Sequence, residues 1–247
     1  MKAREPAEHG LLALLVKDGV AGVDAVVAEA VRRPEAVAEI LAGLESGQAR
    51  VKYGAAKVLR IVSEIAPAHL YPRLDRFIAL LDSENSIFKW NAIFIVANLA
   101  GVDTENLIEG ILPKYFAPIV GPVLITAANI IGGAARFVAA RPRLADFVAR
   151  EVLKVEQACY KTRECRNVAL GAAIESLGRF FEHIRDRSPV IEMVRRQLKN
   201  TRSSTRKKAE QFLREHDPSC LANRPTRPAR PAHRVRRVRP GKRKGRR

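Results

Sequence analysis

Apolar residues recur along this chain at the spacing of amphipathic helices. Val51, Ala55, Val58, Leu59 and Val62 fall on one face at 3.6 residues per turn, with polar residues between them. Further amphipathic runs lie upstream of this segment and of similar segments later in the chain, at residues 36–44, 74–81, 144–155 and 190–198. The pattern predicts pairs of helices, joined by short polar turns such as residues 82–85.

This paired pattern repeats. Residues 51–55 (V-K-Y-G-A) match residues 88–92 (F-K-W-N-A), and the same frame returns at 165–169 and 205–209, with a degenerate copy at 123–127. The alanines that close the five frames are 37, 35, 42 and 40 residues apart: Ala55, Ala92, Ala127, Ala169 and Ala209. A period of this size is typical of stacked helical hairpins, which bury their apolar faces only against their neighbours.

The repeated frame resembles the HEAT repeat. Pro34, Pro72 and Pro189 stand 21, 20 and 20 residues before three of the alanines, near the start of the first helices, where the missing N–H of proline has no helical partner. A proline-marked first helix, a polar turn and V-[KR]-x-x-A opening a second helix together resemble HEAT repeats. The resemblance implies an all-α fold, a right-handed α-α superhelix of about five to six helical hairpins. We expect capping helices at 1–33, the solenoid at 34–216 and a disordered basic tail at 217–247.

One feature that the resemblance implies is missing. HEAT repeats carry an Asp in the turn, three residues before the Val, which bonds to the basic residue across neighbouring repeats. Here the turn positions hold Gln48, Asn85, Thr162 and Arg202. The basic residues of the frames are therefore expected to be freer than usual: Lys52, Lys89, Arg166 and Arg206. Either they pack their stems and keep their charges solvated, or they contact an acidic ligand.

Two adjacent glycines, Gly132 and Gly133, fall inside the predicted second helix of the third repeat. Each costs about 1 kcal/mol relative to Ala in a helix interior. Either the helix bends there or two helices approach closely, and we favour close approach.

Composition narrows the possible classes of protein. The 247 residues are 47% hydrophobic, 28% charged and 6% aromatic, which favours helices. Cys159, Cys165 and Cys220 lack the spacing of zinc ligands and are too few for a disulfide framework, so we expect reduced thiols in a cytoplasmic protein. The apolar run at 11–16 ends at Lys17 and Asp18, and no stretch of 18 apolar residues follows. We therefore expect a soluble protein with no signal peptide or transmembrane segment.

Charge is distributed unevenly along the chain. The formal net charge is +18, from 44 basic and 26 acidic residues. Positions 1–194 hold 24 basic and 23 acidic residues, whereas residues 221–247 hold 12 Lys or Arg and no acid. Such asymmetry indicates an arm that binds a polyanion.

The C-terminal tail is the strongest candidate for function. Arg224, Arg227 and Arg230 each precede a proline at intervals of three, so they would lie along one side of a polyproline II rod. The remaining basic residues of the tail are Arg234, Arg236, Arg237, Arg239, Lys242, Arg243, Lys244, Arg246 and Arg247. With few apolar residues the segment cannot fold alone, and its composition resembles the basic tails of linker-histone-like proteins. We expect DNA or RNA as its partner, with association to the nucleoid or ribosome. An anionic membrane, an acidic protein and a passive solubility tail stay open.

The last repeat extends this basic character. Its cations are predicted to form a platform continuous with the tail: Arg195, Arg196, Lys199, Arg202, Arg206, Lys207 and Lys208. The alternative is the ordinary solvated end cap that solenoids require.

A second candidate site lies on the second helices. Equivalent positions hold Tyr53, Trp90, Ile125, Asn167 and Lys207. Since second helices line the concave side of HEAT arrays, these residues, with Lys52, Lys89 and Arg166, are predicted to form a groove for a protein partner. Tyr and Trp are frequent binding anchors, but burial of both between repeats is the competing interpretation.

The sequence carries no motif of catalysis. No Gly-rich phosphate loop, GxSxG, HExxH or DxD cluster is present, and the histidines are scattered. Alkylpurine DNA glycosylases have a HEAT-like fold, but their chemistry depends on tryptophans and an Asp on the concave face. This chain has one Trp, and Phe94 lies one turn after Trp90. No motif supports a phycobilin-lyase-type activity either. We expect a non-catalytic binding scaffold with no cofactor, metal or small-molecule substrate.

Overall fold

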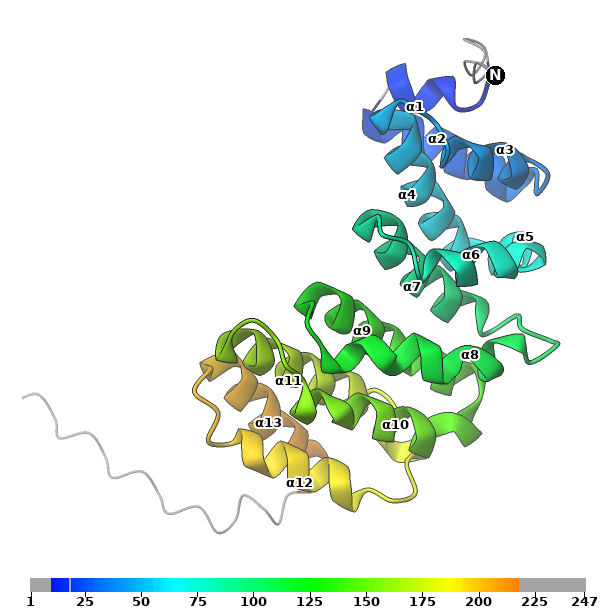
Figure 1. The fold of residues 1–247 in the computed structure, drawn as a ribbon. Coiled ribbons are helices and arrows are strands. Elements are labelled where there is room, and N and C mark those ends of the chain that lie inside the picture. The colour runs from blue at the N-terminus through cyan, green and yellow to red at the C-terminus, as the bar shows by residue number, and fades with distance from the viewer. Residues whose placement is uncertain (1–9, 18, 218–247) are drawn as a thin grey trace, which may run out of the picture.

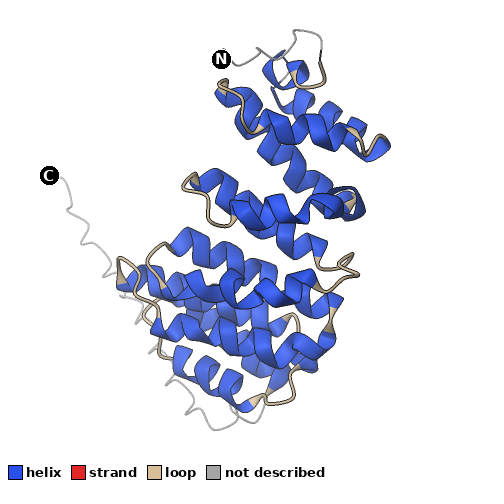
Figure 2. Cartoon of the chain, turned by 45° about the vertical axis from the view of Figure 1, so that its right-hand side comes forward, coloured by secondary structure: helices blue, strands red, loops and turns tan. Residues whose placement is uncertain are grey.

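The chain folds into stacked helical hairpins. The computed structural model describes residues 10–17 and 19–217, and within these ranges every regular element is a helix (Figure 2). The second helices of the hairpins are α2 (Gly19–Arg32), α4 (Ala49–Ile65), α7 (Ser86–Leu99), α9 (Leu124–Ala140), α11 (Arg163–Gly178) and α13 (Ser203–His216). The first helices are α1 (Ala13–Lys17), α3 (Ala36–Gly43), α6 (Leu74–Leu80), α8 (Leu107–Phe116), α10 (Ala145–Leu153) and α12 (Ser188–Gln197).

Short helices flank several first helices. A one-turn helix, α5 (Pro67–Leu70), and a 3-10 turn, η1 (Tyr71–Arg73), precede α6, and each has a proline in its first turn. The other 3-10 turns are η2 (Ala117–Val120), η3 (Pro142–Leu144), η4 (Lys154–Gln157) and η5 (Phe181–His183). The predicted run at 144–155 is therefore α10 with a 3-10 turn at each end.

The hairpins stack in two layers. Each second helix packs on the next, in the order α2, α4, α7, α9, α11 and α13. The first helices lie on the outer side of this row, and the whole stack bends so that the second helices are on the inside of the curve (Figure 1). The chain is thus an all-α, armadillo- or HEAT-like solenoid, as the repeat period predicted.

The five frame alanines explain the stacking. Ala55, Ala92, Ala127, Ala169 and Ala209 all lie near the start of a second helix, and all are 0% exposed. Because the distance between packed helices depends on the side chains at the contact, a small residue at the same place in each helix lets neighbouring second helices approach equally. The predicted register is confirmed at every repeat.

The adjacent glycines of α9 differ in their surroundings. A Cβ on Gly133 would lie 2.5 Å from the Tyr115 hydroxyl oxygen and 3.1 Å from Ala97 Cβ, whereas a Cβ on Gly132 would have nothing within 4 Å. Close approach therefore accounts for Gly133 alone. The first helix of the same repeat, α8, is not among the amphipathic runs predicted above, and it contains Pro113.

Candidate functional site

The turn positions where the HEAT resemblance implies Asp are the N-caps of the second helices. The Asn85 side chain accepts hydrogen bonds from the backbone N–H groups of Ile87 (3.0 Å) and Phe88 (3.4 Å). Thr162 Oγ1 accepts from Cys165 N at 3.1 Å. Asn and Thr are good N-caps, so these two side chains cap the start of their second helices. Gln48 and Arg202 occupy the same place without a capping side-chain bond.

The basic residues of the frames divide into two groups. Arg166 donates from Nε and Nη2 to the carbonyl of Ala158 (3.1 and 2.6 Å), and Arg206 donates to the carbonyls of Asn200 and Thr201 (2.6 and 2.9 Å). Lys52 and Lys89 are half-buried and have no hydrogen bond or ion pair with any described residue. The two arginines therefore close the preceding turns, and the two lysines keep their charges unpaired.

The predicted groove positions do not form one uniform surface. Tyr53 is 38% exposed, and its ring lies 6.1 Å from that of Phe88. Trp90 is half-buried and donates from Nε1 to Thr126 Oγ1 at 3.0 Å, which links α7 to α9. Asn167 is buried between α11 and α13, where it contributes to the contact between repeats.

Exposed apolar side chains gather at the start of three successive second helices. Tyr53 on α4, Ile87 on α7, and Val123 and Ile125 at the start of α9 are between 38% and 51% exposed. We call these four residues the apolar row. Large apolar side chains exposed on consecutive elements can mark an interaction surface.

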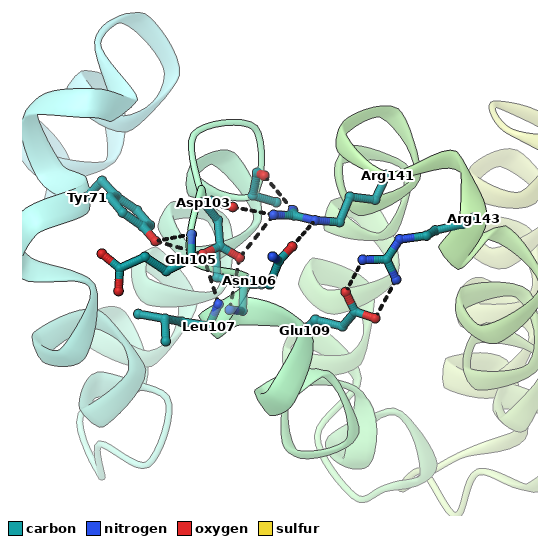
Figure 3. Close-up of polar contacts among 10 residues, drawn as sticks. Tyr71, Asp103, Glu105, Asn106, Leu107, Glu109, Arg141 and Arg143 are labelled. Carbon is teal, nitrogen blue, oxygen red and sulfur yellow. Dashed lines mark hydrogen bonds and ion pairs between the residues drawn. The ribbon is translucent and has the colours of Figure 1, made fainter.

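A buried carboxylate in the loop between two neighbouring repeats joins both of them (Figure 3). Asp103, in the loop between α7 and α8, accepts from Tyr71 OH (2.8 Å), Leu107 N (3.0 Å) and Ile108 N (3.0 Å). It also pairs with Arg141 at 3.4 Å, and its side chain is 0% exposed. Burial, followed by the hydrogen bond to Asp103, raises the pKa of Tyr71 above its usual value. We call these contacts the Asp103 cluster.

Arg141 completes the Asp103 cluster from the end of α9. Its Nη1 donates to the Ala100 carbonyl (2.9 Å), its Nε donates to Asn106 Oδ1 (3.1 Å), and its Nη2 donates to the Asp103 carbonyl. Asn106 adopts the left-handed conformation, with φ of 60°. The side chains of Tyr71, Asp103, Asn106 and Arg141 all have partners among the described residues, so the cluster holds neighbouring repeats together.

Surface ion pairs link neighbouring repeats along both edges. Arg143 holds Glu109 with two bonds of 2.7 Å (Figure 3), and Arg185 Nε lies 2.7 Å from Asp146. Hydrogen bonds from the arginines lower the pKa values of both carboxyl groups. Lys114 pairs with Asp82 at 2.5 Å. These contacts replace the missing turn aspartates as the polar links between repeats.

Most cations of the predicted basic platform are paired with acids. The ion pairs are Arg195 with Asp217, Arg196 with Glu156, Arg202 with Glu164 and Lys208 with Glu175. Within the described part of the chain, Lys199 and Lys207 have no such partner. The tail cations from Arg224 to Arg247 lie outside the described residues.

A hollow of about 650 Å³ opens beside these pairs, between the start of α11 and the α12–α13 turn. Its lining includes the cations Arg163, Arg166, Arg196 and Lys199. We call it the basic hollow. Arg166, Arg196 and Lys199 were predicted as site residues and Arg163 was not, although Lys161, Arg163 and Arg166 form a short run of positive charge.

Comparisons with known proteins give fold neighbours only. No family model matches the sequence, and no curated protein matches it. Among solved structures, a designed armadillo-repeat protein aligns with a TM-score of 0.44 and 15% identity over 83% of this chain and 97% of its own. A second such design, solved with the peptide (KR)4, gives 0.44 and 13% over the same shares. An engineered protein gives 0.43 and 15%, over 83% of this chain and 95% of its own.

No group of three or more His, Cys, Asp or Glu side chains within 10–17 and 19–217 is arranged to hold a metal ion. No helix in these ranges combines the length and apolar character needed to cross a bilayer.

Proposed function

We propose that this protein is a non-catalytic scaffold that binds nucleic acid through its C-terminal end. The observation that carries the proposal is the position of the uncompensated charge. Residues 195–247 contain 20 of the 44 Lys and Arg residues but only 3 of the 26 acidic ones. Nucleic-acid phosphates are the polyanion that such a segment binds by releasing counterions.

The solenoid supports this proposal because the basic segment follows directly from its last repeat in the sequence. Four of its carboxylates at that end are engaged with Arg195, Arg196, Arg202 and Lys208. They are therefore not free to neutralise the basic residues from Arg224 to Arg247. Contacts of this kind give affinity and orientation with little sequence preference.

The test measures the affinity of the full chain for labelled 20-nucleotide DNA and RNA and compares it with the affinity of a chain that ends at Asp217. We expect tight binding at 50 mM salt, and a slope of log K against log salt of about −5 if six phosphates are neutralised. The chain should also co-purify with nucleic acid unless nuclease is added. Equal binding by the truncated chain would overturn a mechanism led by the tail.

The apolar row favours a second candidate function, a protein-interaction adaptor. Four exposed apolar side chains on three consecutive second helices offer a docking strip for an apolar partner segment. Under this proposal Ile87→Ser with Ile125→Ser abolishes capture of a specific protein, identified by mass spectrometry. The matched control is Leu107→Ser, which alters an equally exposed side chain (50%) at the start of α8. Capture that is lost in the control too would contradict a role for the row.

A further inference from the structure

The basic hollow is built by segments of two neighbouring repeats. Residues 158–163 form one wall before α11, the first turns of α11 form a second, and residues 196–201 form the third. Its volume of about 650 Å³ is within the range of small-molecule and cofactor sites, about 300–1,000 Å³. A phosphate group with its attached sugar fits such a space.

The charge of this lining is one-sided. Four of its residues are cations, and no Asp or Glu is among the described residues that line it. Arg196 donates hydrogen bonds of 3.0 and 2.7 Å to Glu156, which is not part of the lining and which neutralises its charge. Arg163 and Lys199 make no hydrogen bond or ion pair with any residue that the structure describes. Two unneutralised cations facing one space favour an anion in it.

Other hollows of similar size differ in this respect. One of about 640 Å³ beside Asn98 is lined by both Glu64 and Arg136. Another, of about 500 Å³ beside Phe212, includes Glu175 and Glu215 with Arg179 and Lys208. In each of these, carboxylates already offset the cations.

The floor of the basic hollow is polar and has its own hydrogen bonds. Asn200 Nδ2 donates to Asn167 Oδ1 (3.1 Å) and to Gln197 Oε1 (2.9 Å), and Asn167 Nδ2 donates to Thr201 Oγ1 (2.9 Å). Because these amides satisfy one another, the floor keeps its shape without a ligand. A polar floor below cationic walls suits an anionic ligand and not an apolar one.

One helix separates the hollow from the start of the C-terminal segment. The α12–α13 turn forms one of its walls, and α13, with 14 residues, separates that turn from residue 217. At 1.5 Å per residue α13 spans about 21 Å. This length corresponds to about six phosphates along one strand of duplex DNA at 3.4 Å each.

We propose that a backbone phosphate of nucleic acid binds in the basic hollow, with Arg163 and Lys199 as its donors. Arg166 adds positive charge from a position fixed by the Ala158 carbonyl, whereas the charge of Arg196 is offset by Glu156. The inference rests on the proposed function and refines it, because it gives the folded part of the chain one defined contact. The strand then continues along α13 toward the basic segment.

The first test compares two double variants of the full chain. Arg163→Gln with Lys199→Gln removes the two proposed donors, and Arg73→Gln with Arg76→Gln removes two exposed cations of the outer layer. For the first variant we expect weaker binding and a salt slope smaller by about 1, since the one phosphate that the two cations hold is no longer neutralised. The control variant keeps the wild-type slope. Identical slopes for the two variants would overturn the inference.

A second test uses the thiol of Cys159, which is exposed and lines the basic hollow. Its rate of alkylation by iodoacetamide is followed by mass spectrometry of the full chain. Saturating oligonucleotide should slow the reaction several-fold, and should fail to do so in the Arg163→Gln, Lys199→Gln variant. An unchanged rate in the wild type contradicts occupation of the hollow.

The two tests separate the inference from the proposed function. If truncation at Asp217 abolishes binding while the double variant binds like the wild type, the scaffold function stands and the hollow is excluded. If inorganic pyrophosphate protects Cys159 and oligonucleotide does not, the hollow binds another anion and the inference fails, while the proposed function is still decided by truncation at Asp217. Protection by polyglutamate alone would instead indicate an acidic protein and likewise overturn the inference.

Discussion

The Asp103 cluster and the basic hollow use the same types of residue in opposite ways. In the Asp103 cluster one buried carboxylate receives a hydroxyl, two backbone N–H groups and an arginine, and the arginine fills its remaining donors with carbonyls and an amide. In the basic hollow the amides of the floor satisfy one another, but Arg163 and Lys199 have no partner among described residues.

This difference separates structural polar groups from available ones. A buried charge is costly unless it is paired and hydrogen-bonded, so a saturated cluster serves the stability of the fold. An exposed cation without a partner costs little, because water solvates it, and it can bind an incoming anion. Composition alone does not distinguish the two, since both regions contain Arg and Asn side chains.

The largest predicted effect follows removal of the Asp103 carboxylate. Asp103→Ala leaves two buried backbone N–H groups without their acceptor and Arg141 without its counter-charge, and should lower the free energy of unfolding by about 3 kcal/mol. Glu105→Ala, an exposed side chain in the same loop, is the matched control and should change it by less than about 0.5 kcal/mol. Urea denaturation measures both. Equal effects would show that the cluster is not a stabilising unit.

The next largest effect concerns α9, the helix that carries Arg141 to the Asp103 cluster. Gly133→Ala places a Cβ against the Tyr115 hydroxyl, and the Tyr115 ring is fixed edge-on against Phe116 and Phe137. We expect the free energy of unfolding to fall by about 1–3 kcal/mol because of overpacking.

Gly132→Ala supplies the opposite case on the same helix. Its Cβ meets no atom within 4 Å, so helix propensity alone should stabilise the protein by up to about 1 kcal/mol. Adding Tyr115→Phe to Gly133→Ala should recover part of the stability, since it removes the clashing oxygen. Similar denaturation midpoints for the two alanine variants would exclude close packing at Gly133.

The sequence was sufficient to predict the stack but not the polar contacts within it. The frame alanines recur because each second helix must approach the next, and that constraint repeats at a fixed spacing. The Asp103 cluster has no such period. Asp103 lies in the loop between two repeats, and its partners Tyr71 and Arg141 come one from each, so no local pattern links the three.

The candidate site was predictable only in part for the same reason. The count of charged residues along the chain predicted a basic C-terminal end. Which of its cations are neutralised depends on which acidic residues of the neighbouring repeat lie opposite them. Arg196 and Lys199 are close in sequence, yet Glu156 neutralises Arg196 and no described residue pairs with Lys199. Arg163 was not predicted as a site residue because it occupies no position of the repeated frame.

A smaller effect on stability is expected at a surface ion pair, which is neither buried like the Asp103 cluster nor unpaired like the cations of the basic hollow. Arg185 lowers the pKa of Asp146 below 3.8 through hydrogen bonds from its side chain and its backbone N–H. A depressed pKa contributes stability that is complete above the ordinary value and is lost as pH falls through the folded value. Asp146→Asn should therefore cost less than about 1 kcal/mol at pH 7.

The pH dependence identifies the cause of that cost. The difference in unfolding free energy between wild type and Asp146→Asn should shrink below about pH 3.8, as the wild-type carboxyl group becomes protonated. Denaturation at pH 7, 4 and 3 measures it. A difference that stays constant with pH would mean that packing, and not the ion pair with Arg185, explains the lower stability of the variant.

The smallest effect on stability is expected at the basic hollow, and it provides the sharpest contrast with the Asp103 cluster. Arg163→Gln with Lys199→Gln removes two cations without stranding any buried group, so the free energy of unfolding should change by less than about 0.5 kcal/mol. The change should be a slight increase at 20 mM salt, where like charges repel, and should vanish at 0.5 M salt, where the repulsion is screened. A decrease of several kcal/mol at either salt would mean that these residues hold the fold together, because a cation kept for a ligand contributes to binding and not to folding.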